Sequence, residues 1–222
     1  MSKFYKDIML ADLLHCAIVK SGFYELLRRQ VQGIDLYMPL TKSAQKLGSD
    51  VIITKPDNTK ICIDEKAQLH YINNPIYSFT MELGFMYKDN FSEGWFLNDN
   101  LNTTHYMFIW LLEAKPYDYI SKIDDFYKIH ICICSKKSIF EYLRLRGISK
   151  EYLRECIKKV IDIPKGVGGK KKITVLDNLE IIQSTKYEEN PINLKINYPI
   201  LKDCSEVNLI LDLSSNMIRK VA

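Results

Sequence analysis

The sequence predicts a mixed α/β or α+β fold, and three observations support this prediction. Hydrophobic residues recur with a helical period over residues 4–29, strand-like runs dominate from residue 51 onward, and a second helical pair lies between strands at residues 136–161. Because helices and strands are interleaved along the chain, we expect a mixed central sheet flanked by helices.

The composition is that of an ordinary globular chain. Of its 222 residues, 47% are hydrophobic and 26% are charged, and the net charge of +4 permits a nucleic-acid partner without requiring one. No apolar run approaches the roughly 20 residues that cross a bilayer, and no basic-then-apolar leader opens the chain. We therefore expect a cytoplasmic protein with no membrane partner. The six cysteines have no zinc-like spacing and are expected to be buried free thiols.

The first helical segment is expected to be divided in two. Ser21 and Gly22 interrupt the apolar period of residues 4–29 and predict a break or a kink there. His15 falls on the apolar face of the first helix, where a histidine is expected to be a core or partly buried residue.

Residues 48–68 predict a β-hairpin. Two apolar runs, at residues 51–53 and 61–63, flank a segment rich in turn-forming residues at 55–58. Proline suits the first bend of such a turn, and aspartate and asparagine tolerate the backbone that follows it. The two runs are therefore expected to pair as antiparallel strands.

The second strand of this hairpin continues into charged residues. Because successive strand side chains alternate between faces, Asp64 and Lys66 are expected on one face and Glu65 on the other. Antiparallel pairing brings Asp50 to the same end of the hairpin as Asp64. Two carboxylates and an ammonium group are thus predicted to converge at one edge of the sheet.

A second aspartate competes with Asp50 for this position. Residues 30–35 and 45–50 both fit the pattern Q-x-x-G-x-D. Asp50 leads directly into the hairpin, whereas Asp35 opens a short strand that a proline ends. We choose Asp50 and keep Asp35 as the alternative.

The rest of the chain is predicted to alternate between strands and helices. Ser149 is a candidate N-cap for the second helix of the later pair. We expect a core domain over residues 1–163 and an extension over residues 164–222, packed on the same domain, that consists of a flexible basic loop and strands. The expected segments are strands at 76–87, 103–113, 127–134, 173–176, 179–183, 192–196 and 207–213, helices at 136–146 and 150–161, and loops at 89–102 and 164–172.

A helix, a strand with an aspartate and a strand that ends in D-E-K together resemble the PD-(D/E)XK nuclease superfamily. Asp50 matches the first acid, Asp64 the second acid and Lys66 the lysine, while Ser49 stands where the motif often has proline. The match covers about 20 residues closely and about 110 loosely. The last 60 or so residues match no family pattern.

The resemblance implies a restriction-endonuclease-like fold with an α-β-β-β-α-β core, and a metal-dependent nuclease, most simply a DNA endonuclease. Asp50 and Asp64 would bind Mg²⁺ or Mn²⁺ together with the backbone carbonyl of Glu65, and Lys66 would act in catalysis. Hydrolysis of a phosphodiester independently favours such a set, because a hard cation held by carboxylates stabilises the charge that develops at phosphorus. Two alternatives are a catalytically inactive member that binds nucleic acid or a protein, and an ordinary charged strand end.

The resemblance also points to accessory residues. Part of the superfamily carries an acid on the first helix, for which Glu25 is the nearest candidate and Asp12 the alternative. Gln68 stands where several members place a polar residue. Glu82, on the polar face of a predicted strand, is a candidate third acid.

The predicted partner is nucleic acid, with DNA favoured. The lysines of the basic loop would contact phosphates as point charges; they are Lys170, Lys171 and Lys172. Cleavage of both DNA strands would favour a homodimer.

Overall fold

A computed structural model describes residues 3–37, 47–88, 90–164, 169–186, 188–215 and 217–221. The chain is α+β, as predicted, and divides into two compact units. Unit 1 comprises Met1–Ile76, Asn102–Lys136 and Ser205–Ala222, and unit 2 comprises Tyr77–Leu101 and Lys137–Cys204. The structure therefore divides the chain differently from the boundary that we expected at residue 163.

Unit 1 is built on a mixed sheet, which has seven strands within the described residues, in the order β1-β2-β3-β6-β7-β11-β12. Neighbouring strands are antiparallel except β3 and β6, which are parallel. The strands are β1 (Asp35–Tyr37), β2 (Val51–Thr54), β3 (Lys60–Ala67), β6 (His105–Ala114), β7 (Phe126–Ser135), β11 (Ser205–Asp212) and β12 (Met217–Lys220).

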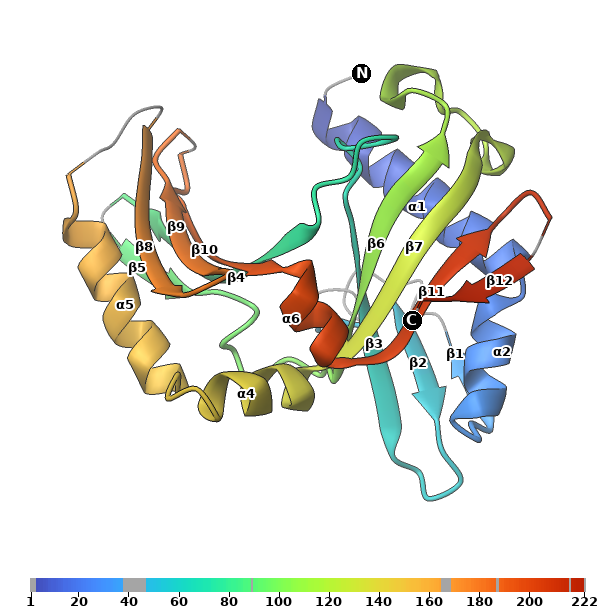
Figure 1. The fold of residues 1–222 in the computed structure, drawn as a ribbon, viewed down its shortest axis with the longest axis horizontal. Coiled ribbons are helices and arrows are strands. Elements are labelled where there is room, and N and C mark those ends of the chain that lie inside the picture. The colour runs from blue at the N-terminus through green and yellow to red at the C-terminus, as the bar shows by residue number, and fades with distance from the viewer. Residues whose placement is uncertain are drawn as a thin grey trace. The chain divides into compact units, whose positions relative to one another are not determined.

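Two helices pack on one face of this sheet (Figure 1), α1 (Lys3–Lys20) and α2 (Phe23–Gln30). The predicted break between them is confirmed, and Gly22 adopts a left-handed φ of 75° that favours glycine. Fully buried aliphatic side chains join the helices to the sheet, among them Ile18, Ile63 and Ile109. Burial of each such side chain contributes about 1.5–3 kcal/mol, so this interface holds the first helix firmly against β3.

The connection between the parallel strands β3 and β6 departs from the expected core. A parallel pair needs a crossover, which is usually a helix. Here the crossover leads into unit 2, through β4 (Ser78–Tyr87) and β5 (Asn90–Glu93). In the described chain, the 3₁₀ turns Tyr117–Tyr119 and Ile123–Asp125 are the only helical segments between β6 and β7, so no α-helix connects these two strands.

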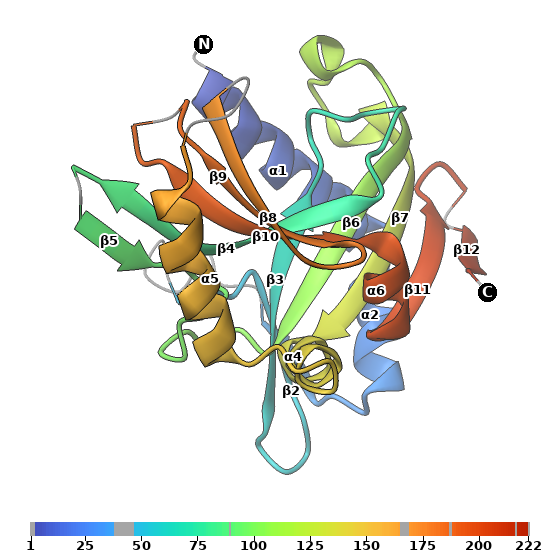
Figure 2. The same cartoon turned by 60° about the vertical axis from the view of Figure 1, so that its left-hand side comes forward.

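Unit 2 contains an antiparallel sheet, five-stranded in its described part, in the order β5-β4-β10-β9-β8. Helix α5 lies along β8 and β9 (Figure 2), and the predicted cap is present because Ser149 Oγ accepts a hydrogen bond from the Tyr152 N–H. The remaining elements are α4 (Lys136–Arg144), α5 (Lys150–Asp162), β8 (Lys170–Leu176), β9 (Leu179–Ser184), β10 (Pro191–Asn197) and α6 (Tyr198–Asp203).

Two sequence predictions in unit 2 were wrong, and one helix was missed. Residues 170–172, expected in a flexible loop, begin strand β8, while residues 165–168 of that loop lie outside the described chain. Residues 90–93, also expected in a loop, form β5, and α6 was not predicted. These segments are polar or short, so their pairing partners decide their structure more than their own composition does.

The cysteines are free, and all except Cys16 are buried. The prediction of buried thiols is thus confirmed for five of them and wrong for Cys16. None of the helices in the described residues is both long enough and apolar enough to cross a membrane.

Candidate functional site

The hairpin of β2 and β3 fixes Asp50 at its open end. Val51 pairs with Ile63, and one step earlier the Asp50 N–H donates to the Ile63 carbonyl at 2.8 Å. The Asp50 carboxylate then accepts the Glu65 N–H at 2.8 Å. This side chain takes the place of a main-chain carbonyl and extends the ladder by one step, so the position of Asp50 is set by the backbone of β3.

The turn that leads into Asp50 is also held. Gly48 has a φ of 75°, and its carbonyl accepts the hydroxyl of Thr103 at 2.6 Å, just ahead of β6. Ser49 is only 3% exposed, and its hydroxyl finds no hydrogen-bond partner within the described part of the protein. A buried hydroxyl without a partner is costly and is usually explained by a ligand or water.

Asp64 and Lys66 lie on the same face of β3. The Lys66 ammonium is 2.9 Å from Asp64 Oδ2, and Asp64 is only 8% exposed. Asp64 stands opposite Tyr106 in the parallel register with β6. Strand alternation therefore presents the second acid and the lysine together, beside Asp50.

The two aspartates are not ordinary acids. Burial, the largest cause, raises the pKa of Asp50 to about 6; the hydrogen bond from Glu65 opposes the rise, and the charge on Asp64 adds to it. Burial also raises the pKa of Asp64, while the nearby Lys66 ammonium opposes that rise. One ammonium for two adjacent carboxylates leaves the pair short of positive charge.

Glu65 faces the helices instead. Its Oε1 atom accepts a hydrogen bond from the Tyr24 hydroxyl of α2 and lies 2.8 Å from His15 Nδ1 of α1. The bond to Glu65 is the largest cause that raises the pKa of His15, and burial and Glu65 raise that of Tyr24, which keeps its proton. A core or partly buried histidine was expected at His15, which is partly buried, whereas Tyr24 was not predicted as a site residue. The sequence signal for such partners was Glu65 itself, because a charge at the end of an apolar strand face needs hydrogen-bond donors around it.

Other predicted acids lie apart from this cluster. Asp35 is exposed and stands opposite Thr54, at the other end of β2, about 13 Å along the strand. Glu25 is exposed and pairs with Arg28 at 3.1 Å. Asp12 is exposed, and its charge acts on His15 by raising the pKa of the imidazole.

Gln68 has a structural contact. Its amide group donates to the Ile76 carbonyl at 2.6 Å and accepts the Ile76 N–H at 3.1 Å. It therefore closes the loop after β3, a role that does not require a substrate.

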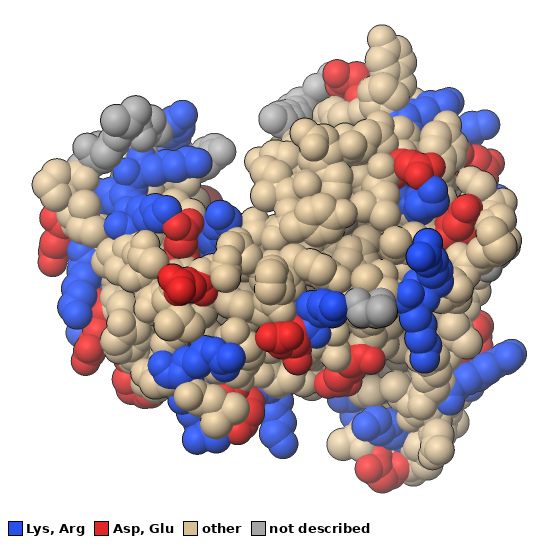
Figure 3. All heavy atoms as spheres, in the orientation of Figure 1, with Lys and Arg blue, Asp and Glu red and all other residues tan. Residues whose placement is uncertain are grey.

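Glu82 and the basic residues belong to unit 2, whereas the acidic cluster is built from unit 1 alone. Basic side chains gather over the part of the surface where Figure 1 draws β8, β9 and α5 (Figure 3). Lys171 donates to the Ile161 carbonyl, Lys172 pairs with Glu180, and Lys170 is exposed. Local contacts thus occupy two of the three lysines that we expected to bind phosphate.

The donor set fits a hard divalent cation in part. No group of three His, Cys, Asp or Glu side chains converges as a metal site within the described ranges. Asp50 and Asp64 nevertheless supply two adjacent carboxylates with a deficit of positive charge. Mg²⁺ is commonly held by one or two carboxylates, with water and substrate phosphate as the other ligands, and the pair suits that pattern.

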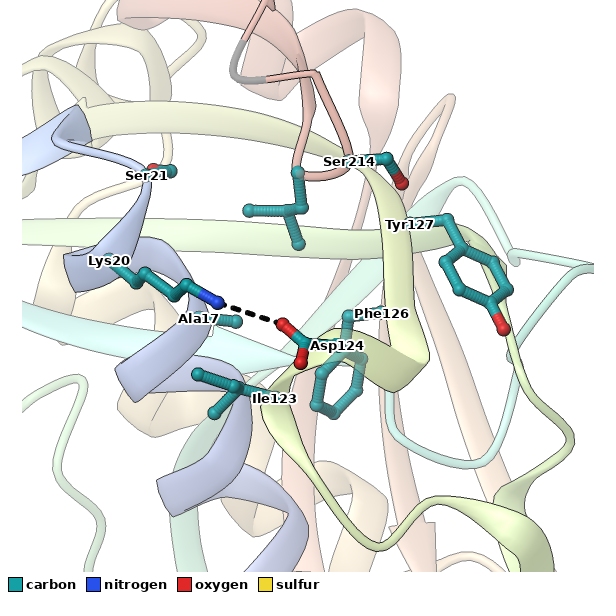
Figure 4. Close-up of a pocket in the computed structure, with 9 residues that line it drawn as sticks. Ala17, Lys20, Ser21, Ile123, Asp124, Phe126, Tyr127 and Ser214 are labelled. Atoms are coloured by element: carbon teal, nitrogen blue, oxygen red, sulfur yellow. Dashed lines mark hydrogen bonds and ion pairs between the residues drawn. The ribbon is translucent and has the colours of Figure 1, made fainter.

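A separate hollow of about 320 Å³ lies at the C-terminal end of α1. Lys20 and Asp124 point toward each other there, with 2.9 Å between Nζ and Oδ1 (Figure 4). Both side chains are more than half exposed, so this is a surface ion pair of small energetic value. The hollow contains none of the residues that we predicted for the site.

No family model matches the chain, and neither the curated proteins nor the solved structures include a significant match.

Proposed function

We propose that this protein is a metal-dependent nuclease that hydrolyses phosphodiester bonds, with DNA as the favoured substrate and Mg²⁺ or Mn²⁺ as the cofactor. The observation that carries the proposal is the convergence of Asp50, Asp64 and Lys66 at the open end of one hairpin. These residues match the acid, acid and lysine of the PD-(D/E)XK pattern that the sequence resembles.

Each residue has a role in this proposal. Asp50 and Asp64 would hold the cation together with the backbone carbonyl of Glu65, and the cation, when bound, supplies stabilisation for charge on the phosphoryl oxygens. Lys66 donates hydrogen bonds that orient the attacking water and offset negative charge as the bond to phosphorus forms. Its ammonium is already held at 2.9 Å from Asp64, so little reorganisation is needed.

The charge balance of the cluster supports the same proposal. A carboxylate pair whose pKa values are raised, chiefly by burial and at Asp50 also by the charge of Asp64, is unfavourable when both groups are ionised. Perturbed acids of this kind are concentrated at functional sites. A divalent cation removes the deficit that Lys66 leaves.

The test is cleavage of plasmid DNA with Mg²⁺ or Mn²⁺ by the wild type, Asp64→Asn and Lys66→Ala. We expect both variants to lose at least about 100-fold in rate, since each removes a group that contacts the reacting phosphate or its cation. Lys60→Ala is the matched control, because Lys60 is an exposed lysine on the same strand. Its rate should equal that of the wild type.

Two outcomes would contradict the nuclease. Cleavage that persists unchanged in Lys66→Ala and Asp64→Asn would come from a contaminant or from another site. Absence of cleavage in every variant, with salt-sensitive retention of DNA, would favour the nuclease-fold protein that only binds nucleic acid.

A further inference from the structure

Glu65 joins three elements of unit 1 at the candidate site. It lies on β3 between Asp64 and Lys66, yet its carboxylate points to the opposite face, between α1 and α2. Its side chain is only 11% exposed. A buried carboxylate is stable only when hydrogen-bond donors surround it, and here the donors come from His15 and Tyr24.

The main chain of the same residue binds the first acid. The Glu65 N–H donates to Asp50 Oδ2 at 2.8 Å. Rotation or displacement of the backbone at this position would move that N–H, which is the β3 donor to the Asp50 carboxylate, while the Asp50 main chain is held separately by the Ile63 carbonyl. The Glu65 side chain therefore controls the orientation of the peptide unit to which Asp50 is bonded.

The two donors are themselves rigidly held. Tyr24 is 1% exposed, its ring packs edge-on against Phe23 at 5.5 Å between centroids, and its ring lies 5.9 Å from that of His15. Both helices are packed on the sheet through buried aliphatic residues. An anchor of this kind fixes a strand more tightly than the ladder alone, because it adds contacts perpendicular to the sheet.

We infer that His15 and Tyr24 are positioning residues of the candidate nuclease site, which act through Glu65 to hold the backbone between Asp64 and Lys66 and the carboxylate of Asp50. This inference rests on the proposed function for its effect on cleavage. The geometric part, in which the helices hold the Glu65–Asp50 hydrogen bond, is independent of any activity.

The first measurement follows the amide hydrogen of residue 65 in metal-free protein by hydrogen exchange. In the double variant His15→Phe/Tyr24→Phe we expect exchange about tenfold faster than in the wild type, because the strand loses its anchor. His70→Phe is the matched control, since it removes another histidine–carboxylate contact to α1, with Asp7 at 3.2 Å. In that control the exchange at residue 65 should not change.

The second measurement is plasmid cleavage with Mg²⁺. Partners that orient ligands from outside typically contribute 10- to 100-fold, and we expect a loss of about that size in the double variant. Glu65→Ala should lose cleavage in the same way, whereas Glu65→Gln keeps an oxygen that accepts the Tyr24 hydroxyl and should retain the slow exchange of the residue 65 amide. Tyr24→Phe alone deletes only a hydroxyl and serves if the double variant does not fold.

The outcomes separate the two proposals. Unchanged exchange at residue 65 in the double variant overturns the inference, whether or not the protein cleaves DNA. Faster exchange in the double variant, when the wild type itself does not cleave DNA, supports the helix anchor and rejects the nuclease. Cleavage that falls equally in His70→Phe would mean a general loss of stability and would also overturn the inference.

Discussion

Unit 1 contains two sites with buried carboxylates, one at Asp125 and one at Asp50 and Asp64. The pKa is lowered at the first site and raised at the second. Asp125 is 1% exposed, accepts the N–H groups of Ser121 and Lys122 at 2.9 and 3.1 Å, and pairs with Lys115 at 2.7 Å. These contacts, with Lys115 as the largest cause, lower the pKa of Asp125 to about 2. Burial instead raises the pKa of Asp50 to about 6.

The difference lies in how completely each carboxylate is satisfied. Asp125 has a lysine of its own and two main-chain donors, so its charge stabilises the loop that it closes. Asp50 and Asp64 share one lysine, and the charge on Asp64 adds to the rise in the pKa of Asp50. This difference in partners, a lysine and two main-chain donors for Asp125 against one shared lysine for the pair, distinguishes a structural carboxylate from a candidate ligand site.

The largest effect on stability should come from Asp125→Ala. The variant leaves the N–H groups of Ser121 and Lys122 without their acceptor, so we expect the melting temperature to fall by about 5 °C or more. Because the pKa of Asp125 is lowered in the folded protein, its contribution is present above about pH 4 and is lost toward pH 2. Thermal unfolding at pH 7 and pH 3 measures both effects.

Asp118→Ala is the control for this variant. Asp118 also lies in a 3₁₀ segment, but its side chain is 85% exposed and its ion pair with Lys6 is 3.7 Å long. Equal melting temperatures for the two variants would contradict the structural role of Asp125.

Asp50→Asn should stabilise the protein, in contrast to Asp125→Ala. The asparagine oxygen still accepts the Glu65 N–H, while the repulsion with Asp64 is removed, so we expect the free energy of unfolding to rise by about 1–3 kcal/mol at pH 7.5. A raised pKa in the folded state means that the wild type loses stability as the pH rises from about 4 through 6. The gain should therefore disappear below about pH 4.

Denaturant unfolding in metal-free buffer measures this gain. Asp57→Asn, in the exposed turn of the same hairpin, is the control and should not be stabilised. Addition of Mg²⁺ should stabilise the wild type and not Asp50→Asn, because only the wild type retains the pair. A loss of stability in Asp50→Asn at pH 7.5 would contradict the deficit of positive charge.

The smallest effects should come from the acids that the fold keeps away from the cluster. Glu25→Gln removes an exposed pair with Arg28, and Asp35→Asn changes an exposed strand start. We expect changes below about 0.5 kcal/mol in unfolding free energy and cleavage within about twofold of the wild type. A large loss of cleavage in Glu25→Gln would show that Glu25 takes part in the site.

Local rules were sufficient to predict the hairpin. Alternation along β3 places Asp64 and Lys66 on one face, and a tight turn determines which residues of β2 reach them. The choice of Asp50 over Asp35 also follows from the hairpin, because only Asp50 lies at its open end.

Contacts between segments that are distant in the sequence could not be predicted from these local rules. Tyr24 contacts Glu65 only because α2 packs on the sheet, and no local sequence pattern predicts that contact. The lysines of β8 resembled a solvated loop because strand pairing with β9, as at Lys172 and Ile182, was not visible locally. The division into two units depends likewise on the pairing of β10 with β4.

That pairing has a consequence for how the chain acquires its structure. β4 must wait for β10, and β7 must wait for β11, so the sheet of unit 2 is not complete until residue 197 is available and that of unit 1 not until residue 220. Such long sequence separations slow folding, whereas a hairpin closes in microseconds. We therefore expect Asp50 and Asp64 to meet early in folding, long before the parts of the scaffold that hold them in place.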